Sequence, residues 1–112
     1  MEKLDLYREW IMKVLQGNFD PPTLMTEGVE EQLLFDTIRD HYQILAIGWE
    51  NKRRVYFPIL HLDIKNGKIW VQENSTDLNI AAALEEKGVP KSDIVLAFHT
   101  PNVRPFTGYA VA

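Results

Sequence analysis

The strongest constraint on the fold is a pair of strand-like segments joined by the dipeptide Asn66-Gly67. The flanking segments, 54–65 and 68–73, are rich in aliphatic, β-branched and aromatic residues. Asn-Gly between two such segments is typical of a two-residue hairpin turn, because both residues accept positive φ. The sequence therefore predicts an antiparallel hairpin. Its predicted cross-strand pairs are Lys65 with Lys68, Asp63 with Trp70, and His61 with Gln72.

Two further strands precede this hairpin. The segments 29–38 and 41–49 have strand composition, and the polar turns Arg39-Asp40 and 50–53 bound the second of them. If Asn51-Lys52 is a two-residue turn, the second and third strands also pair in a fixed register. The predicted sheet is a four-stranded antiparallel meander. Its further predicted pairs are Tyr42 with His61 and Ile44 with Ile59.

Two helices are predicted to cover this sheet. Residues 2–16 carry apolar side chains at i, i+3 and i+4 spacing, and Gly17 is expected to end that helix. A second helix is predicted over 80–87, with Thr76 or Asp77 as its cap and Gly88 at its end. The predicted class is α+β, with an N-terminal helix and a second helix packed on one face of the meander.

The remaining segments have weaker signals. Residues 18–28, which contain Pro21-Pro22, are predicted to form a connecting loop. Residues 94–98 are apolar and suit either a short strand or a helical turn, and no element is assigned to 102–112. Residues 1–112 are interpreted as a single domain, because 112 residues suffice for one hydrophobic core.

Composition narrows the classes of function. The chain has 12 Lys and Arg residues against 16 Asp and Glu residues, so its formal charge is −4. Stand-alone nucleic-acid binders are normally basic, so this balance favours a protein partner. The absence of cysteine excludes disulfides, thiol catalysis and thiolate zinc sites. The sequence shows neither a signal peptide nor a membrane span, so we expect a cytoplasmic protein.

The predicted register divides the apolar strand residues between two faces. One face is interpreted as the core beneath the helices and comprises Leu45, Ile47, Leu60, Leu62, Ile64, Ile69 and Val71. The other face carries an unusual number of large apolar groups, and exposed patches of that kind mark interaction surfaces. Its residues are predicted to bind a partner protein or a second copy of the chain: Leu33, Phe35, Ile44, Val55, Phe57, Ile59 and Trp70. The alternative is that loop 18–28 or the C-terminal tail covers them.

Three polar groupings could carry chemistry. Asp40, Asp63 and Lys65 superficially match the two carboxylates and lysine of Mg²⁺-dependent nucleases, although a solvated strand end explains them more simply. A second alternative to protein binding is direct contact of the basic residues with DNA. Those residues are Lys52, Arg53, Arg54, Lys65 and Lys68.

The histidines do not form a predicted metal site. His61 and Asp63 share a face, but the predicted register places His41 on the opposite face, and His99 lies far along the chain. Two ligands are too few for a zinc or iron site. No metal, cofactor or catalytic residue is therefore predicted.

Four blocks of sequence carry a family resemblance. They are Phe35 to Gln43 followed by Gly48-Trp49, His61 to Gln72, Gly88 to Leu96, and Arg104 to Ala112. In their order and spacing they resemble the XisI family, the fdxN element excision controlling factors of cyanobacteria and some other bacteria. The resemblance covers nearly the whole chain.

The resemblance implies a role rather than a reaction. XisI-like proteins are associated with programmed excision of a DNA element and are paired with XisH, whereas a separate recombinase performs the recombination. The implied function is a non-catalytic controlling factor that binds an XisH-like protein and reaches DNA only through its partners. No catalytic residues are implied by the family.

Overall fold

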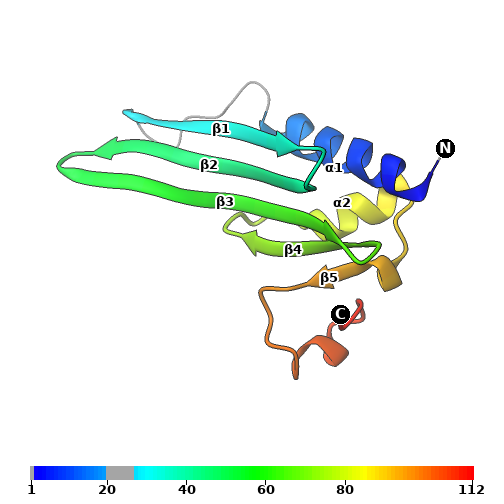
Figure 1. Cartoon of the computed structure of the whole chain (residues 1–112). Helices are drawn as coiled ribbons and strands as arrows, with labels where there is room; N and C mark the ends of the chain where they lie inside the picture. Colours follow the sequence, from blue (N-terminus) through cyan, green and yellow to red (C-terminus); the bar gives the residue numbers. More distant parts are fainter. Residues whose placement is uncertain (1, 20–26) are drawn as a thin grey trace.

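The fold is a five-stranded sheet with two helices behind it (Figure 1). The computed structural model describes residues 2–19 and 27–112. The elements, in chain order, are α1 (Lys3–Phe19), β1 (Val29–Asp36), β2 (His41–Glu50), β3 (Arg53–Lys65), β4 (Lys68–Asn74), α2 (Ile80–Lys87), the 3₁₀ turn η1 (Lys91–Asp93), β5 (Ile94–Leu96) and the 3₁₀ turn η2 (Arg104–Phe106). The predicted α+β class is confirmed, and β5 adds a fifth strand, parallel to β4.

The tight turns of the meander use residues with positive φ. Asn51 and Asn66 have φ of 58° and 55°, and Asp40 has φ of 62°. Asparagine and aspartate tolerate this conformation better than other residues with a side chain. β1 ends at Asp36 rather than at Ile38, because the Asp36 carboxylate accepts hydrogen bonds from the backbone N–H groups of Ile38 and Arg39. This local turn takes the place of the last two residues of the predicted strand, Thr37 and Ile38.

Both helices differ slightly from the predicted boundaries. α1 continues through Gly17 to Phe19, since one glycine weakens a helix by only about 1 kcal/mol. α2 is capped by Asn79, whose side-chain oxygen accepts a hydrogen bond from the Ala82 N–H, and not by Thr76 or Asp77. Gly88 ends α2 as predicted. Of the predicted loop 18–28, residues 20–26 lie outside the described residues.

Two β-bulges change the register away from the turns. β2 and β3 pair as predicted from the turn to Leu45 and Pro58, but Ile44 then pairs with Leu60, so Ile59 is an extra residue. Along β3 and β4, Leu62 pairs with Val71 but His61 pairs with Glu73, which leaves Gln72 as the extra residue. The predicted pairs Tyr42–His61, Ile44–Ile59 and His61–Gln72 are therefore wrong, while Lys65–Lys68 and Asp63–Trp70 are confirmed.

The bulge at Ile59 decides which face holds the core. Leu60 and Leu62 lie in the core as predicted, but on the same face as Ile44 and Val55. This face packs against both helices and is called the covered face. Its fully buried side chains include Ile11 and Leu15 of α1, Tyr42 and Ile44 of β2, Leu60 and Leu62 of β3, Ile69 and Val71 of β4, and Ile80 and Leu84 of α2. Because side chains alternate along a strand, Leu45 and Ile47 point to the other face, contrary to prediction.

The C-terminal segment folds back along β5. Ala110 donates a backbone hydrogen bond to the Ile94 carbonyl, and Arg104 holds the intervening loop. The Arg104 guanidinium donates to the carbonyl oxygens of His99 and Ala97 at 3.0 and 3.2 Å. Within residues 2–19 and 27–112, no helix combines the length and apolar character that crossing a membrane requires.

Candidate functional site on the open face of the sheet

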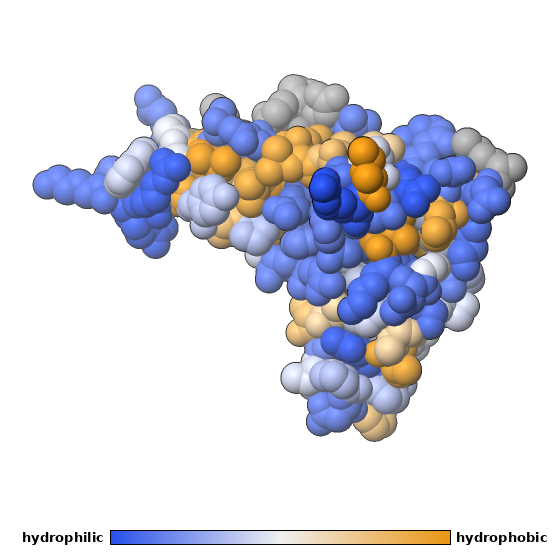
Figure 2. Space-filling view, viewed as in Figure 1, coloured by the Kyte–Doolittle hydropathy of each residue, from blue (hydrophilic) through white to orange (hydrophobic). Residues whose placement is uncertain are grey.

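The open face is the face of the sheet turned away from the helices. It carries several large apolar side chains that are exposed. Leu34, Trp49 and Tyr56 are 44%, 54% and 64% exposed. In the space-filling view, apolar surface extends over β1 to β3 between polar flanks (Figure 2). We define the open-face patch by six side chains that alternation directs to this face: Leu34, Leu45, Ile47, Trp49, Tyr56 and Pro58.

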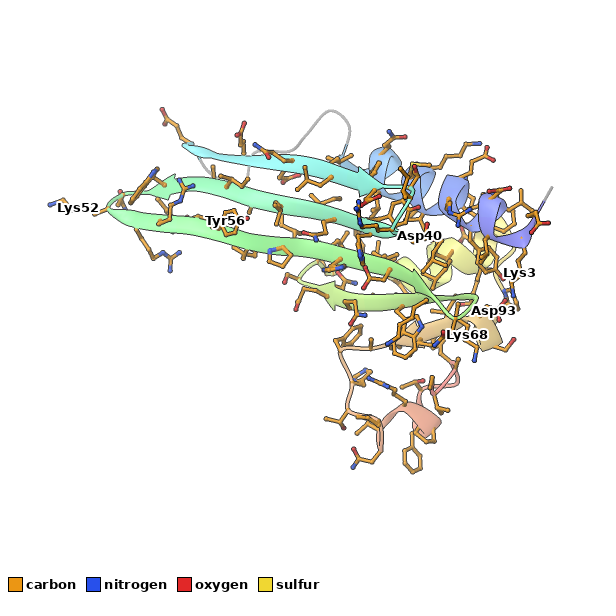
Figure 3. All side chains as sticks on the ribbon, in the orientation of Figure 1. Lys3, Asp40, Lys52, Tyr56, Lys68 and Asp93 are labelled. Atoms are coloured by element: carbon orange, nitrogen blue, oxygen red, sulfur yellow. The ribbon has the colours of Figure 1, made fainter. Side chains whose placement is uncertain are left out.

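The patch is continuous across the two longest strands. Ile47 pairs with Tyr56, and Leu45 pairs with Pro58. At its end, the Arg54 guanidinium lies 5.4 Å from the centre of the Trp49 ring, which is cation–π distance. Figure 3 shows Tyr56 on β3, well away from α1 and α2, with Lys52 at the far tip of the hairpin. The result is a flat apolar surface with a basic residue at one end.

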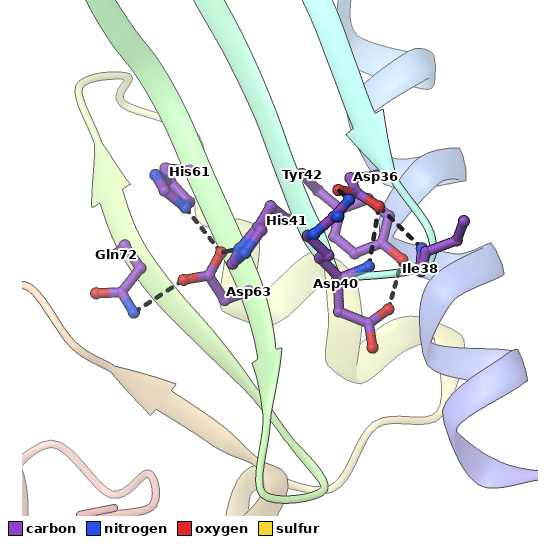
Figure 4. Close-up of polar contacts among 9 residues, drawn as sticks. Asp36, Ile38, Asp40, His41, Tyr42, His61, Asp63 and Gln72 are labelled. Carbon is purple, nitrogen blue, oxygen red and sulfur yellow. Dashed lines mark hydrogen bonds and ion pairs between the residues drawn. The ribbon is translucent and has the colours of Figure 1, made fainter.

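A histidine–aspartate cluster lies on the same face (Figure 4). Both His41 Nδ1 and His61 Nε2 contact one carboxylate oxygen, Oδ1 of Asp63, at 2.8 and 2.7 Å. The side-chain amide of Gln72 donates to the second carboxylate oxygen, Oδ2, at 3.3 Å. Asp63 is therefore held from three sides by residues of β2, β3 and β4.

The prediction that His41 and His61 lie on opposite faces is wrong. The Ile59 bulge shifts the pairing by one residue, so Asp63 pairs with His41 and His61 pairs with Gln43. Both histidines then point to the open face, and their rings stand edge to face with centroids 6.3 Å apart. Neither the hairpin turn nor the apolar pattern of β3 indicated that extra residue.

Most of the residues predicted to bind a partner lie inside the protein. Ile44, Val55 and Ile59 belong to the core cluster, and Leu33, Phe35 and Phe57 pack against it in partly buried positions. The prediction that these residues form an open surface is wrong, because the bulge at Ile59 turns Leu60 and Leu62 to the same face and that face is the one the helices cover. Binding of a partner by these six residues remains a prediction, but their side chains lack the exposure that the prediction assumed.

Trp70, the seventh residue of that set, does lie on the open face. It is only 8% exposed, and its indole N–H donates to the Lys65 carbonyl at 3.0 Å. Cations flank its ring, with Lys65 Nζ at 4.5 Å and the Arg104 guanidinium at 5.7 Å from the centroid. The C-terminal segment therefore covers this end of the open face.

The nuclease-like grouping does not form. Arg8 donates to both carboxylate oxygens of Asp40, at 2.7 and 3.1 Å, and the Tyr42 hydroxyl donates to the same carboxylate at 3.0 Å. The Arg8 hydrogen bonds, joined by that from Tyr42, lower the pKa of Asp40 despite its partial burial. Burial, and then the bond to Asp40, raises the pKa of Tyr42. Asp40 is thus engaged by α1, while Asp63 is engaged by the histidines and Lys65 by Trp70.

The basic residues are also engaged individually. Arg53 forms an ion pair with Glu50 at 3.1 Å, and Arg54 lies on Trp49. Lys68 donates to the backbone oxygen of Ala112 at 2.5 Å. The predicted basic set is therefore divided between the hairpin tip and the opposite end of β3, and it does not form one continuous strip along a groove.

Sequence reasoning missed three contributors to these sites. Arg8 was counted only as part of the first helix, and Trp49 and Tyr56 were not assigned to a patch. Trp49 could have been found from strand alternation, since it follows Leu45 and Ile47 at spacings of two. No local signal in the sequence identifies Asp40 as the partner of Arg8, because the two are 32 positions apart.

The chain matches a known family and solved structures over nearly its full length. Residues 1–111 match the family described as XisI protein. A XisI-like protein from Anabaena variabilis ATCC 29413 is 43% identical, with a TM-score of 0.90 over 97% of this chain and 99% of that chain. The fdxN element excision controlling factor XisI from the same organism is 40% identical, with a TM-score of 0.90 over 99% of this chain and 100% of that chain. Comparison with curated proteins finds no match.

Proposed function

The chain belongs to the XisI family, and we propose that it acts as a non-catalytic controlling factor for programmed excision of a DNA element. It does so in the cytoplasm by binding an XisH-like protein, and it reaches DNA only through that partner. A structure 40% identical to this chain is described as an fdxN element excision controlling factor.

The observation that carries the protein-binding role is the open-face patch. Its three most exposed side chains are a leucine, a tryptophan and a tyrosine, and aromatic residues are enriched at the centres of protein interfaces. A flat sheet face with a partly apolar surface suits docking of another folded protein rather than enclosure of a small molecule. Leu45 of the patch is only 7% exposed, so the accessible area comes mainly from its more exposed neighbours.

The charge of the chain supports an indirect role at DNA. Its formal charge of −4 disfavours direct contact with a polyanion and favours a partner with a basic surface. Binding of this acidic chain then either restrains the partner from DNA or orients it there. Restraint lowers the partner's affinity for DNA, whereas orientation raises it. The engaged state of Asp40, bound by Arg8 and Tyr42, supports the absence of nuclease chemistry.

The test is co-expression of this chain with the XisH-like protein from the same cells. We expect the wild-type pair to co-purify, and Tyr56→Asp to abolish co-purification because it places a charge in the centre of the patch. The matched control is Phe106→Asp, since Phe106 is an exposed aromatic residue of η2, off the sheet. Loss of the pair in both variants, or in neither, would contradict docking at the open face.

Two further measurements separate this role from its alternatives. Size measurement of the isolated chain at high concentration tests whether a second copy occupies the patch instead. Incubation of the isolated chain with duplex DNA and Mg²⁺ tests the nuclease alternative, and we expect neither a salt-dependent shift nor cleavage.

A further inference from the structure

We propose that His41, His61 and Asp63 form a binding site for a divalent transition-metal ion of the zinc class. This site goes beyond the proposed controlling role and does not rest on it. No other trio of histidine, aspartate and glutamate side chains within residues 2–19 and 27–112 converges in this way.

The first argument is convergence. One ligand atom from each of the three side chains lies within 4.8 Å of the other two. The two imidazole nitrogens already meet a single oxygen, Oδ1 of Asp63, at 2.8 and 2.7 Å. Two imidazoles and one carboxylate that face a common point form the donor set of many metal sites with three protein ligands.

The second argument is the donor chemistry. Imidazole nitrogen with carboxylate oxygen suits Zn²⁺, Cu²⁺, Ni²⁺ and Fe²⁺, whereas Mg²⁺ and Ca²⁺ favour sites made of oxygen alone. The chain contains no cysteine, so no thiolate competes for such an ion. Among the three histidines of the chain, His99 is excluded from the trio, because only His41 and His61 converge with Asp63.

The adjustment needed to admit an ion is small. Zn²⁺ at about 2.0–2.1 Å from each ligand places ligand atoms roughly 3.3 Å apart in a tetrahedral site. The two N···O distances, now 2.8 and 2.7 Å, must therefore lengthen by roughly half an ångström each. The His41 side chain is 51% exposed and that of His61 is 27% exposed, so both rings have room to rotate while the strands stay in place.

The third argument is the support behind the carboxylate. Gln72 donates to Oδ2 of Asp63, which leaves Oδ1 directed at the two imidazoles. Hydrogen bonds of this kind to ligating carboxylates are a regular feature of metal sites. Gln72 is itself the extra residue of the bulge in β4, and the bulge in β3 brings His61 and Asp63 beside His41. Both irregularities of the sheet thus serve one cluster, and bulges often redirect side chains at functional sites.

The position of the cluster leaves room for further ligands. It lies on the open face, and the three protein ligands leave at least one coordination position for water or an incoming side chain. An ion there would add positive charge beside the open-face patch of an acidic chain.

The experiment uses untagged full-length protein, freed of metal with a chelator and titrated with Zn²⁺ in a calorimeter. We expect binding of one ion per chain and no binding of Mg²⁺ at concentrations that saturate with Zn²⁺. His41→Asn, His61→Asn and Asp63→Asn should each weaken Zn²⁺ binding at least about tenfold, and Gln72→Leu about tenfold. His99→Asn is the matched control and should bind like the wild type. Circular dichroism confirms that each variant is folded.

A second readout identifies the ligand atoms. Nitrogen-15 spectra of the imidazoles should show Zn²⁺ on Nδ1 of His41 and on Nε2 of His61, with the ring of His99 unchanged. Failure of the wild type to bind Zn²⁺ would overturn the proposal. Binding that survives His41→Asn and His61→Asn, or coordination through the other ring nitrogens, would overturn it equally.

Discussion

The two faces of the sheet differ in what fixes their side chains. On the covered face, Ile44, Leu60 and Leu62 are fully buried against the helices, and their position depends on close packing. On the open face, Asp63 accepts hydrogen bonds from two imidazoles and an amide, and Trp49 and Tyr56 are more than half exposed. Packing specifies the first face, whereas hydrogen bonds and exposed side chains characterise the second. Four substitutions test this difference, from the largest expected effect to the smallest.

Removal of a covered-face side chain should have the largest effect. Leu62 is fully buried at the centre of the core, so Leu62→Ala leaves a cavity that the surrounding helices and strands fill only in part. We expect a loss of about 3 kcal/mol in the free energy of unfolding, measured by urea denaturation. A loss below about 1 kcal/mol would mean that the covered face is not the main core.

A glycine at the edge of the covered face tests how closely the strands approach. A Cβ added at Gly48 would lie 2.0 Å from the carbonyl oxygen of Gly28, which is part of the backbone. Gly48→Ala should therefore force β1 and β2 apart and destabilise the protein by about 2 kcal/mol. Gly17→Ala in α1 is the control, because nothing lies within 4 Å of its added Cβ, and it should be neutral or stabilising. Equal effects at the two glycines would contradict the close approach.

The rim between α1 and the sheet should show a pH dependence. Arg8 and Tyr42 lower the pKa of Asp40 below its value in the unfolded chain, so the ionised carboxylate stabilises the fold. That stabilisation is complete above the unfolded pKa of about 3.9 and is lost as the pH falls through the lower folded pKa. Asp40→Asn should thus destabilise the protein at pH 7 but not in acid. Thermal unfolding of both proteins from pH 7 to pH 2 measures this, and a gap that stays constant would refute it.

Substitutions on the open face should have the smallest effect on stability. Tyr56 is 64% exposed, so Tyr56→Ala should change the free energy of unfolding by no more than about 0.5 kcal/mol. The same strand then contains one residue whose loss is severe, Leu62, and one whose loss is mild. A large effect at Tyr56 in the isolated chain would indicate that its ring is packed there, and it would weaken the interpretation of the patch as a docking surface.

The sequence was sufficient for the meander and its turns. Asn66-Gly67 and Asn51 are local signals, and the pairs next to each turn, such as Lys65 with Lys68, follow from them. The helices followed from their apolar spacing, apart from their ends. The observed helix boundaries differ from the predicted ones at the Asn79 cap and at Gly17. At both positions the alternatives differ little in free energy.

The candidate site could not be derived in the same way. A single extra residue, Ile59, reverses the face of everything beyond it in β3, as expected for a side-chain period of two. The turns alone predict that Leu60 and Leu62 lie on the other face of the sheet from Ile44. They also predict that His61 lies on the other face from His41. Position 59 itself is an ordinary apolar strand residue, buried in the core, and no local pattern in the sequence sets it apart. One insertion thus explains both the wrong assignment of the patch and the missed histidine cluster.

Docking of a protein on the open face is most directly tested by hydroxyl-radical footprinting of the chain alone and in complex with the XisH-like protein. We predict strong protection of Trp49 and Tyr56 in the complex, with no change at Phe106, which is 88% exposed on η2. Unchanged oxidation of Trp49 and Tyr56 in a complex that has demonstrably formed would contradict the account.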